Sequence, residues 1–425
     1  MSSSGWTPAK ATALLLEREL FGMRFELDRI QALLNKLGNP QDTFRSVHVV
    51  GTNGKTSTTR FTAAALAAAG LKVGAYVSPH LTGFHERVLL SDAEGMSEVD
   101  PAVFADAVGR VAEASSQVEQ EVLEGELVTQ FELVTAAAML VYAEAEVEVA
   151  VIEAGLGGRW DATNVLNSPK TVVLTSVGLD HTRWLGNDVE SIATEKVAVV
   201  GEGDVLIVPS TLSDGPHEVA VEVAASHGAE LRVVDAGDVG HVSLEAIGPF
   251  QRENFALAVA AAQNAAGGIT EGQVKAAAAI TIPGRMMVVD NEPLTILDGA
   301  HNPQGAERVS EALAELAEAR SVVGVIGMLE DKDAIGFLKS LAPNLGSVIA
   351  TSPLNPRALG AEELAEIVVE AGIERDNVIV EPDAHAAVIA ARGISGKDGV
   401  VIVTGSIHLV GDLVSAPGER VVTSL

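Results

Sequence analysis

The feature that constrains this chain most is residues 46–60, where a short apolar strand runs into a glycine turn. Residues 47–50 are mostly β-branched, which is the composition of a buried parallel strand. The turn holds Gly51 and Gly54, and an alanine-rich helix is predicted over residues 61–69. Glycines let backbone N–H groups approach phosphate oxygens, and the start of the helix adds a partial positive charge. The stretch therefore predicts a phosphate-binding loop.

The residues after the turn fit the same chemistry. Lys55 would bring a point charge to the outer phosphates, and the hydroxyl of Thr56 or Ser57 would bind Mg²⁺. Val49 stands where the general phosphate-loop motif has its first glycine, so the motif is a variant of the common form. The alternative is a glycine-rich strand–helix turn that binds no ligand.

Composition excludes several classes of protein. The 425 residues leave room for two or three domains and a large core. With 47% hydrophobic and 20% charged residues, the chain is globular rather than disordered. The formal net charge of −30 argues against nucleic-acid binding, which needs a basic surface. The absence of cysteine excludes disulfides and thiolate metal sites.

The sequence also bears on location. Residues 1–6 have no basic segment followed by an apolar core, so no signal peptide is visible. Alanine-rich runs such as residues 61–69 are too short to span a bilayer. We therefore expect a cytoplasmic monomer that acts on small molecules, with no membrane partner.

A second signal is a pair of metal-binding side chains at predicted strand ends. The strand over residues 147–152 delivers Glu153, and a glycine-rich segment follows as far as Asn164. The carboxyl edge of a parallel strand is where an α/β fold places a Mg²⁺ ligand. The next strand, residues 171–177, leads to His181. A dinucleotide fingerprint is the alternative interpretation of the glycines, but their spacing is incomplete.

A third signal lies in the C-terminal part, where an alternating strand–helix pattern restarts. This pattern predicts a parallel sheet with helices on both faces. We therefore expect an α/β protein with a P-loop parallel-sheet ATPase domain over residues 1–288 and a smaller Rossmann-like domain over residues 289–425. The first strand of the second domain, residues 294–297, leads to Asp298 and His301 at an edge where ligand sites form.

Together these motifs resemble the folylpolyglutamate synthase/dihydrofolate synthase family of the Mur ligase superfamily, nearly from end to end. The matching segments are residues 39–41, 51–57, 78–81, 129–132, 153–164, 180–181 with 185–186, 195–196, 282–285 and 298–303. Two positions depart from the family pattern. Thr56 stands where the folate branch often has glycine, and Phe250 precedes Gln251 where a His-Gln pair is usual.

The resemblance implies a set of site residues, with catalytic roles for Lys55, Lys196, Asp298 and His301. ATP would contact Thr52, Asn53, Gly54, Lys55, Thr56, Ser57, Asn254, Arg285 and Asp298. Mg²⁺, at two sites, would be held by Thr56, Ser78, Glu153 and His181. The pteridine would lie near Thr129, Phe131, Asp161 and Ala162, and the incoming glutamate near His301.

Some of these implied roles make chemical sense from the side chains themselves. Phe131 can stack on a pteridine ring, and Asp161 can accept hydrogen bonds from its amino-pyrimidine edge. The resemblance also implies that Lys196 is carbamylated. A carbamate turns the lysine cation into a carboxylate-like anion, which suits a position beside divalent cations.

The predicted reaction follows from these parts. ATP would phosphorylate a substrate carboxylate, and the amino group of L-glutamate would displace phosphate from the acyl phosphate. We expect glutamate to be added both to dihydropteroate and to reduced folates. The alternatives are a monofunctional folylpolyglutamate synthase and a Mur-type peptide ligase, which would need a separate domain before the phosphate loop. A nucleotide-dependent switch is a further alternative, but it has no need of Glu153, Lys196 or the strand end at Asp298.

Overall fold

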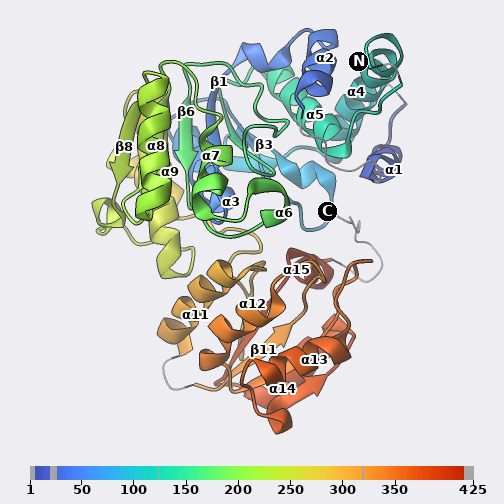
Figure 1. The fold of residues 1–425 in the computed structure, drawn as a ribbon, viewed down its shortest axis with the longest axis vertical. Coiled ribbons are helices and arrows are strands. Elements are labelled where there is room, and N and C mark those ends of the chain that lie inside the picture. Colours follow the sequence, from blue (N-terminus) through green and yellow to red (C-terminus); the bar gives the residue numbers. More distant parts are fainter. Residues whose placement is uncertain (1–4, 20–25, 124, 318–319, 416–425) are drawn as a thin grey trace. The chain divides into compact units, whose positions relative to one another are not determined.

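The structure is a computed structural model that describes residues 5–19, 26–123, 125–317 and 320–415 (Figure 1). The chain forms two compact units. The first contains the residues up to Ser243 together with Arg252–Ile280, and the second contains Leu244–Gln251 and the residues from Thr281 onward. Each unit is built around its own sheet.

The first unit contains an eight-stranded sheet in the order β4-β3-β2-β5-β1-β6-β7-β8. Strand β1 lies between β5 and β6 and pairs with both in parallel, and the run from β2 to β8 is parallel throughout. β3 and β4 add an antiparallel edge. The strands are β1 Arg45–Val50, β2 Val73–Tyr76, β3 Val88–Asp92, β4 Gly95–Glu98, β5 Val149–Glu153, β6 Thr171–Leu174, β7 Val205–Pro209 and β8 Glu230–Val234.

Helices pack around this sheet, and α1, α2, α4 and α5 gather together in the first unit (Figure 1). Local sequence explains where several helices begin. Asp100 caps α4 just before Pro101, and Thr129 forms a capping box with Glu132 at the start of α5. The helices are α1 Pro8–Glu19, α2 Asp28–Lys36, α3 Lys55–Ala68, α4 Pro101–Glu121, α5 Gln130–Glu144, α6 Thr182–Leu185, α7 Val189–Val197, α8 Asp214–Ser226, α9 Pro249–Ala266 and α10 Glu271–Ala278. Short 3₁₀ turns cover Pro40–Thr43, Phe84–Arg87 and Ala236–Val239.

The second unit contains a six-stranded sheet in the order β13-β12-β11-β14-β10-β9. All neighbours pair in parallel except β9, which runs antiparallel to β10. The strands are β9 Met287–Asn291, β10 Leu294–Leu297, β11 Val322–Ile326, β12 Ser347–Ala350, β13 Val378–Val380 and β14 Val400–Thr404. The helices are α11 Pro303–Ala317, α12 Ala334–Leu341, α13 Ala361–Glu370, α14 Ala384–Ser395 and α15 Ile407–Val414, with 3₁₀ turns at Ala342–Asn344 and Arg375–Asn377.

The α/β fold class predicted from the sequence is confirmed, and two kinds of feature differ from the prediction. The antiparallel edges formed by β3 and β4 and by β9 were not expected from a parallel pattern. The predicted boundary after residue 288 falls inside β9, whereas the chain divides at Thr281.

No helix among the described residues combines the length and apolar character needed to cross a bilayer.

Candidate active site

The predicted phosphate loop joins β1 to α3, and its glycines are required by geometry. Gly54 has φ of 89°, in the left-handed region, and a Cβ there would lie 2.3 Å from Oδ1 of Asn254. A Cβ on Gly51 would lie 1.9 Å from Oγ1 of Thr175. Lys55 is the first residue of α3, and its Nζ donates to the carbonyl oxygens of Gly51 and Thr52, each 3.1 Å away. The lysine is therefore held over the loop.

The loop is braced by the segment that follows β6, which the sequence analysis did not identify as part of the site. Thr52 N donates to the carbonyl of Ser176 at 2.9 Å, and Asn53 N donates to Ser176 Oγ at 3.0 Å. Thr175 Oγ1 donates to the carbonyl of Asn53 at 2.7 Å. The two hydroxyls therefore hold the backbone of Asn53, and the carbonyl of Ser176 holds that of Thr52. The neighbouring Ser57 is buried.

Glu153 connects the phosphate loop with the metal-binding residues predicted at the strand ends. It is the last residue of β5 and is 1% exposed. Thr56 Oγ1 donates to its Oε1 at 3.0 Å, and Ser78 N approaches its Oε2 at 3.2 Å. Three of the four predicted metal-binding residues therefore meet at the carboxyl ends of neighbouring strands. Thr56 is the loop hydroxyl that contacts the carboxylate.

His181, the fourth predicted metal-binding residue, is exposed and lies just before α6. Its Nε2 is 3.8 Å from Oδ1 of Asp180. Thr52 Oγ1 donates to the carbonyl of Gly178, which ties this stretch to the phosphate loop. Among the described residues, no group of three or more His, Cys, Asp and Glu side chains is arranged to hold a metal ion. The predicted set has two such side chains, and its other members are hydroxyl residues.

Lys196 lies on α7 and reaches the same loop. Its Nζ donates to the carbonyl of Gly51 at 2.9 Å, the same acceptor that Lys55 uses. The side chain is buried, and burial together with the nearby charge of Lys55 lowers its pKa from 10.5 to about 7, against the opposing pull of Asp180 and Asp161. A sizeable fraction of these amines is therefore neutral at physiological pH.

The glycine-rich segment after β5 packs closely on its surroundings. A Cβ on Gly158 would lie 2.4 Å from the carbonyl oxygen of Lys196. Arg159 N donates to the carbonyl of Glu195 at 2.9 Å, and Arg159 Nε donates to the Glu195 carboxylate at 2.8 Å. These contacts anchor the segment to the helix that carries Lys196.

Phe131 and Asp161, two predicted pteridine-binding residues, flank the same glycine. A Cβ on Gly155 would lie 2.6 Å from Cζ of Phe131 and 3.2 Å from Oδ2 of Asp161. Asp161 Oδ2 also accepts from Leu156 N at 2.8 Å. Burial raises the pKa of Asp161, and the hydrogen bonds that it accepts oppose this. Ala162, beside it, is buried.

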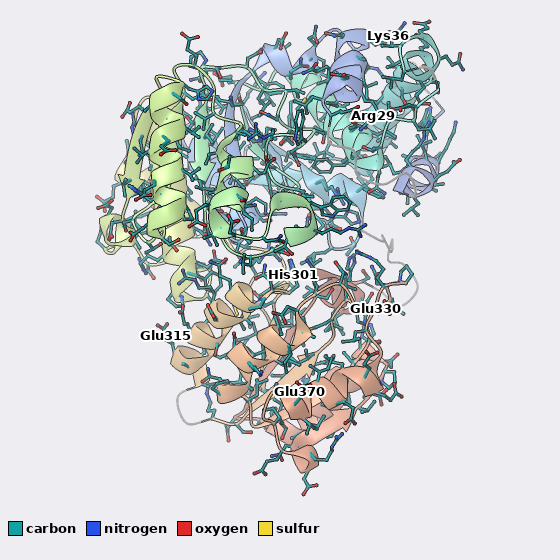
Figure 2. All side chains as sticks on the ribbon, viewed as in Figure 1. Arg29, Lys36, His301, Glu315, Glu330 and Glu370 are labelled. Atoms are coloured by element: carbon teal, nitrogen blue, oxygen red, sulfur yellow. The ribbon has the colours of Figure 1, made fainter. Side chains whose placement is uncertain are left out.

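The start of α5 places Phe131. Thr129 caps this helix, and its N–H and hydroxyl both donate to Oε2 of Glu132, at 2.7 and 2.8 Å. Arg29 on α2, labelled in Figure 2, is buried and donates through Nε to the same carboxylate at 3.3 Å. The ring of Phe131 lies 6.1 Å from that of Tyr76 on β2. These contacts hold Phe131 at the carboxyl edge of the sheet.

Asn254 on α9 is buried against the phosphate loop, because its Oδ1 occupies the space beside Gly54. Thr58 Oγ1 lies 3.5 Å from its backbone carbonyl. The structure thus brings this predicted nucleotide-binding residue to the loop from a position about 200 residues further along the chain.

The second unit brings Arg285, Asp298 and His301 together. Asp298 is buried, and its two carboxylate oxygens accept from Met286 N at 2.9 Å and Ala300 N at 2.8 Å. Burial raises the pKa of Asp298, and the charge of Arg285 opposes this. His301, labelled in Figure 2, lies just before α11, and its Nδ1 is 3.0 Å from the carbonyl of Gly299. Asp298 therefore shapes the turn that carries His301.

Comparison with known proteins supports one family. Residues 49–210 match the Mur ligase middle domain, and residues 284–407 match the Mur ligase glutamate ligase domain. The chain is 34% identical over 404 residues to the dihydrofolate synthase/folylpolyglutamate synthase of Mycobacterium tuberculosis, which covers 84% of this chain and 82% of that protein.

Solved structures of this family superpose on almost the whole length of this chain. The folylpolyglutamate synthase of Mycobacterium tuberculosis, complexed with ADP, superposes with a TM-score of 0.89 at 30% identity, covering 96% of this chain and 97% of that one. The bifunctional folylpolyglutamate synthase/dihydrofolate synthase of Yersinia pestis, complexed with AMPPNP and Mn, gives a TM-score of 0.83 at 29% identity, covering 97% and 98%. This chain belongs to the dihydrofolate synthase/folylpolyglutamate synthase family of Mur ligases.

Proposed function

We propose that this protein is an ATP-dependent ligase that joins L-glutamate to dihydropteroate and to reduced folates. The observation that carries the proposal is the convergence at one sheet edge of a phosphate loop, the buried carboxylate of Glu153, and the Phe131–Asp161 pair. The first two groups suit phosphoryl transfer. The third suits a flat, nitrogen-rich ring, because it offers an aromatic face and a carboxylate acceptor.

The reaction requires activation of a carboxylate, whose oxide is a poor leaving group. Transfer of the γ-phosphoryl group of ATP to the substrate carboxylate gives an acyl phosphate and ADP. The amino group of glutamate then attacks the acyl carbon, the amide forms, and phosphate leaves. Lys55, held over the loop, would offset the charge that develops on the phosphoryl oxygens, and Arg285 is proposed to contribute in the same way.

The residues around Glu153 fit a divalent cation. Mg²⁺ prefers oxygen ligands, and here a buried carboxylate lies against the hydroxyl-bearing residues Thr56 and Ser78. We assign these residues, with His181, to cation binding at two sites. A bound cation would screen the negative charge of the phosphates. The relative from Yersinia pestis, with its nucleotide analogue and Mn, supports a requirement for nucleotide and divalent cation.

We assign Lys196 to carbamylation. CO₂ reacts with the neutral form of an amine, and the lowered pKa of about 7 makes that form available. The buried side chain reaches the loop carbonyl of Gly51. A carbamate there would exchange an unfavourable second cation beside Lys55 for an anion that can face the metal ions.

The remaining roles are divided between the two domains. The first domain would bind ATP and the pterin, with Thr52, Asn53, Gly54, Ser57 and Asn254 at the nucleotide and Thr129 and Ala162 at the pteridine. In the second domain, Asp298 is assigned to ATP and His301 to the incoming glutamate. These assignments rest on the motifs and on the placement of Asp298 and His301 at one strand end.

The test is ADP formation with Mg²⁺, ATP and L-glutamate, with dihydropteroate and tetrahydrofolate supplied in separate reactions. The proposal expects turnover with each acceptor, and none when glutamate or the acceptor is omitted. Turnover with tetrahydrofolate alone would identify a monofunctional folylpolyglutamate synthase. ADP formation at a rate that neither acceptor changes would overturn the assignment as a ligase.

A further inference from the structure

His48 is a polar residue in β1, a strand of the first unit that is buried at every position except its first. It lies in the middle of β1, paired on one side with Ile152 of β5 and on the other with Val172 of β6, and it is 0% exposed. Burial, assisted by the charge of Lys170, lowers its pKa to about 3. The ring is therefore neutral, and a neutral imidazole buried in a sheet is costly unless it makes hydrogen bonds.

The ring makes one contact that explains its presence. His48 Nε2 lies 2.8 Å from Oγ1 of Thr163. The hydroxyl of Thr163 already donates to Oδ1 of Asp161, at 2.5 Å. A hydroxyl has one hydrogen, so Thr163 can take part in both contacts only by accepting from His48. The proton of His48 is thus on Nε2, and Nδ1 has no hydrogen-bond partner among the described atoms.

This chain of hydrogen bonds fixes the carboxylate of Asp161. Its Oδ1 receives both the hydroxyl and, at 3.0 Å, the backbone N–H of Thr163. Its Oδ2 accepts from Leu156 N at 2.8 Å and lies beside Gly155, where the ring edge of Phe131 also lies. Burial raises the pKa of Asp161. Among the hydrogen bonds that oppose this rise, the one from the hydroxyl of Thr163 has the largest effect. The contacts therefore keep this carboxylate both oriented and able to accept.

We propose that His48, acting through Thr163, is a positioning residue for pterin recognition, because it orients the hydroxyl that holds Asp161 toward the substrate site. The proposal rests on the proposed function, in which Asp161 accepts from the pteridine. His48 belongs to the strand that leads into the phosphate loop. The strand that positions ATP thereby also orients the group that recognises the acceptor.

The first test replaces Thr163. T163V keeps the shape of the buried side chain and removes the hydroxyl, whereas T163S retains the hydroxyl. We expect T163V to raise KM for dihydropteroate about tenfold, as the loss of one hydrogen bond to a charged group does. KM for ATP, KM for glutamate and kcat at saturating dihydropteroate should stay within about twofold. T163S should restore KM for dihydropteroate.

A matched control comes from the second unit. Thr351 is 0% exposed, and its hydroxyl donates one hydrogen bond, to the carbonyl of Pro382 at 3.1 Å. T351V removes a comparable buried bond and should leave KM for dihydropteroate unchanged. If T163V and T351V lower the unfolding temperature alike and neither alters KM, the role of Thr163 is structural and the proposal is overturned.

The second test addresses His48. Leucine removes the donor, whereas the amide of glutamine places an N–H near the position of Nε2. H48L should raise KM for dihydropteroate, as T163V does. H48Q should return this KM most of the way to the wild-type value. The double variant H48L/T163V should show no larger KM than T163V, because both changes break one chain of contacts. Additive effects would show that His48 does not act through Thr163.

The wild-type protein separates this inference from the proposed function. Failure of the wild-type protein to use dihydropteroate would overturn the proposed function and, with it, this inference. Normal use of dihydropteroate by wild type, T163V and H48L alike would overturn the inference and leave the proposed function standing.

Discussion

At the scale of the residue, two lysines of the candidate site share one hydrogen-bond acceptor. Lys55 and Lys196 both donate to the carbonyl of Gly51. Burial and the like charge of Lys55 both favour loss of a proton from Lys196, and they lower its pKa to about 7. At pH 7 about half of such amines are neutral, against roughly one in 3,000 at an ordinary lysine pKa.

We predict from this that Lys196 carries a carbamate. Incubation with ¹³C-labelled bicarbonate at pH 8 should give a carbamate carbonyl signal in the ¹³C NMR spectrum. The signal should decline as pH falls through about 7, because the ammonium form cannot attack CO₂. K196R, whose guanidinium stays protonated, should lack both the signal and ligase activity. A persistent signal in K196R would place the carbamate elsewhere.

Glu153 gives a second prediction at this scale. E153Q removes the negative charge and keeps the shape. It should therefore weaken Mg²⁺ binding, so that turnover needs a higher Mg²⁺ concentration, and it should lower kcat about 100-fold or more. E222Q, which changes an exposed carboxylate on α8, is the control and should behave as wild type. An E153Q protein with an unchanged Mg²⁺ titration would contradict the assignment of Glu153 to cation binding.

Sequence alone could identify the side chains of these clusters but not all of the contacts that hold them. Lys55 and Thr56 were predictable because the motif is local. Thr175 and Ser176, which brace the loop, carry no local pattern beyond two hydroxyls after a strand. The contact between Asn254 and Gly54 joins distant segments, so no spacing rule reveals it.

At the scale of the element, the two ends of α3 offer a matched pair of glycines. Gly54 and Gly70 have φ of 89° and 85°, but a Cβ on Gly54 would strike Asn254 whereas one on Gly70 meets nothing within 4 Å. G70A should cost about 1 kcal/mol of stability and spare ATP affinity. G54A should lower ATP affinity about tenfold or more as well, because Asn254 must move. Calorimetric titration with ATP distinguishes the two, and equal affinities would contradict the account.

Two threonines that cap helices offer a second matched pair of substitutions. Thr129 and Thr270 each form a capping box, with Glu132 and Gln273 respectively. T129A and T270A should each cost about 1 kcal/mol of stability in denaturant unfolding. T129A alone should raise KM for dihydropteroate, since it also loosens the turn that carries Phe131. An identical KM in both variants would confine Thr129 to a stabilising role.

The elements themselves were predictable in proportion to the strength of their patterns. Buried parallel strands such as β1 and β11 are rich in β-branched residues, and Asp100 before Pro101 marks the start of α4. β4 is a short edge strand, and the antiparallel pairing of β3 with β4 depends on a hairpin that composition does not reveal. For the same reason β9 was not predicted.

At the scale of the whole molecule, the chain distributes its chemistry over two units. The phosphate loop, Glu153, Lys196 and the pterin candidates belong to the first, whereas Arg285 and His301 belong to the second. From the sequence we predict a boundary after residue 288, because an alternating strand–helix pattern restarts there, whereas the contacts of the structure divide the chain at Thr281. Under the proposed function both units are needed for one reaction.

The central claim is that a substrate carboxylate is phosphorylated before glutamate attacks. The most direct test supplies dihydropteroate labelled with ¹⁸O in its carboxylate, together with Mg²⁺, ATP and L-glutamate, and analyses the products by mass spectrometry. The account predicts dihydropteroate extended by one glutamate and one ¹⁸O atom in each phosphate released. Phosphate without the label, or ATP consumption with no glutamate adduct, would contradict it.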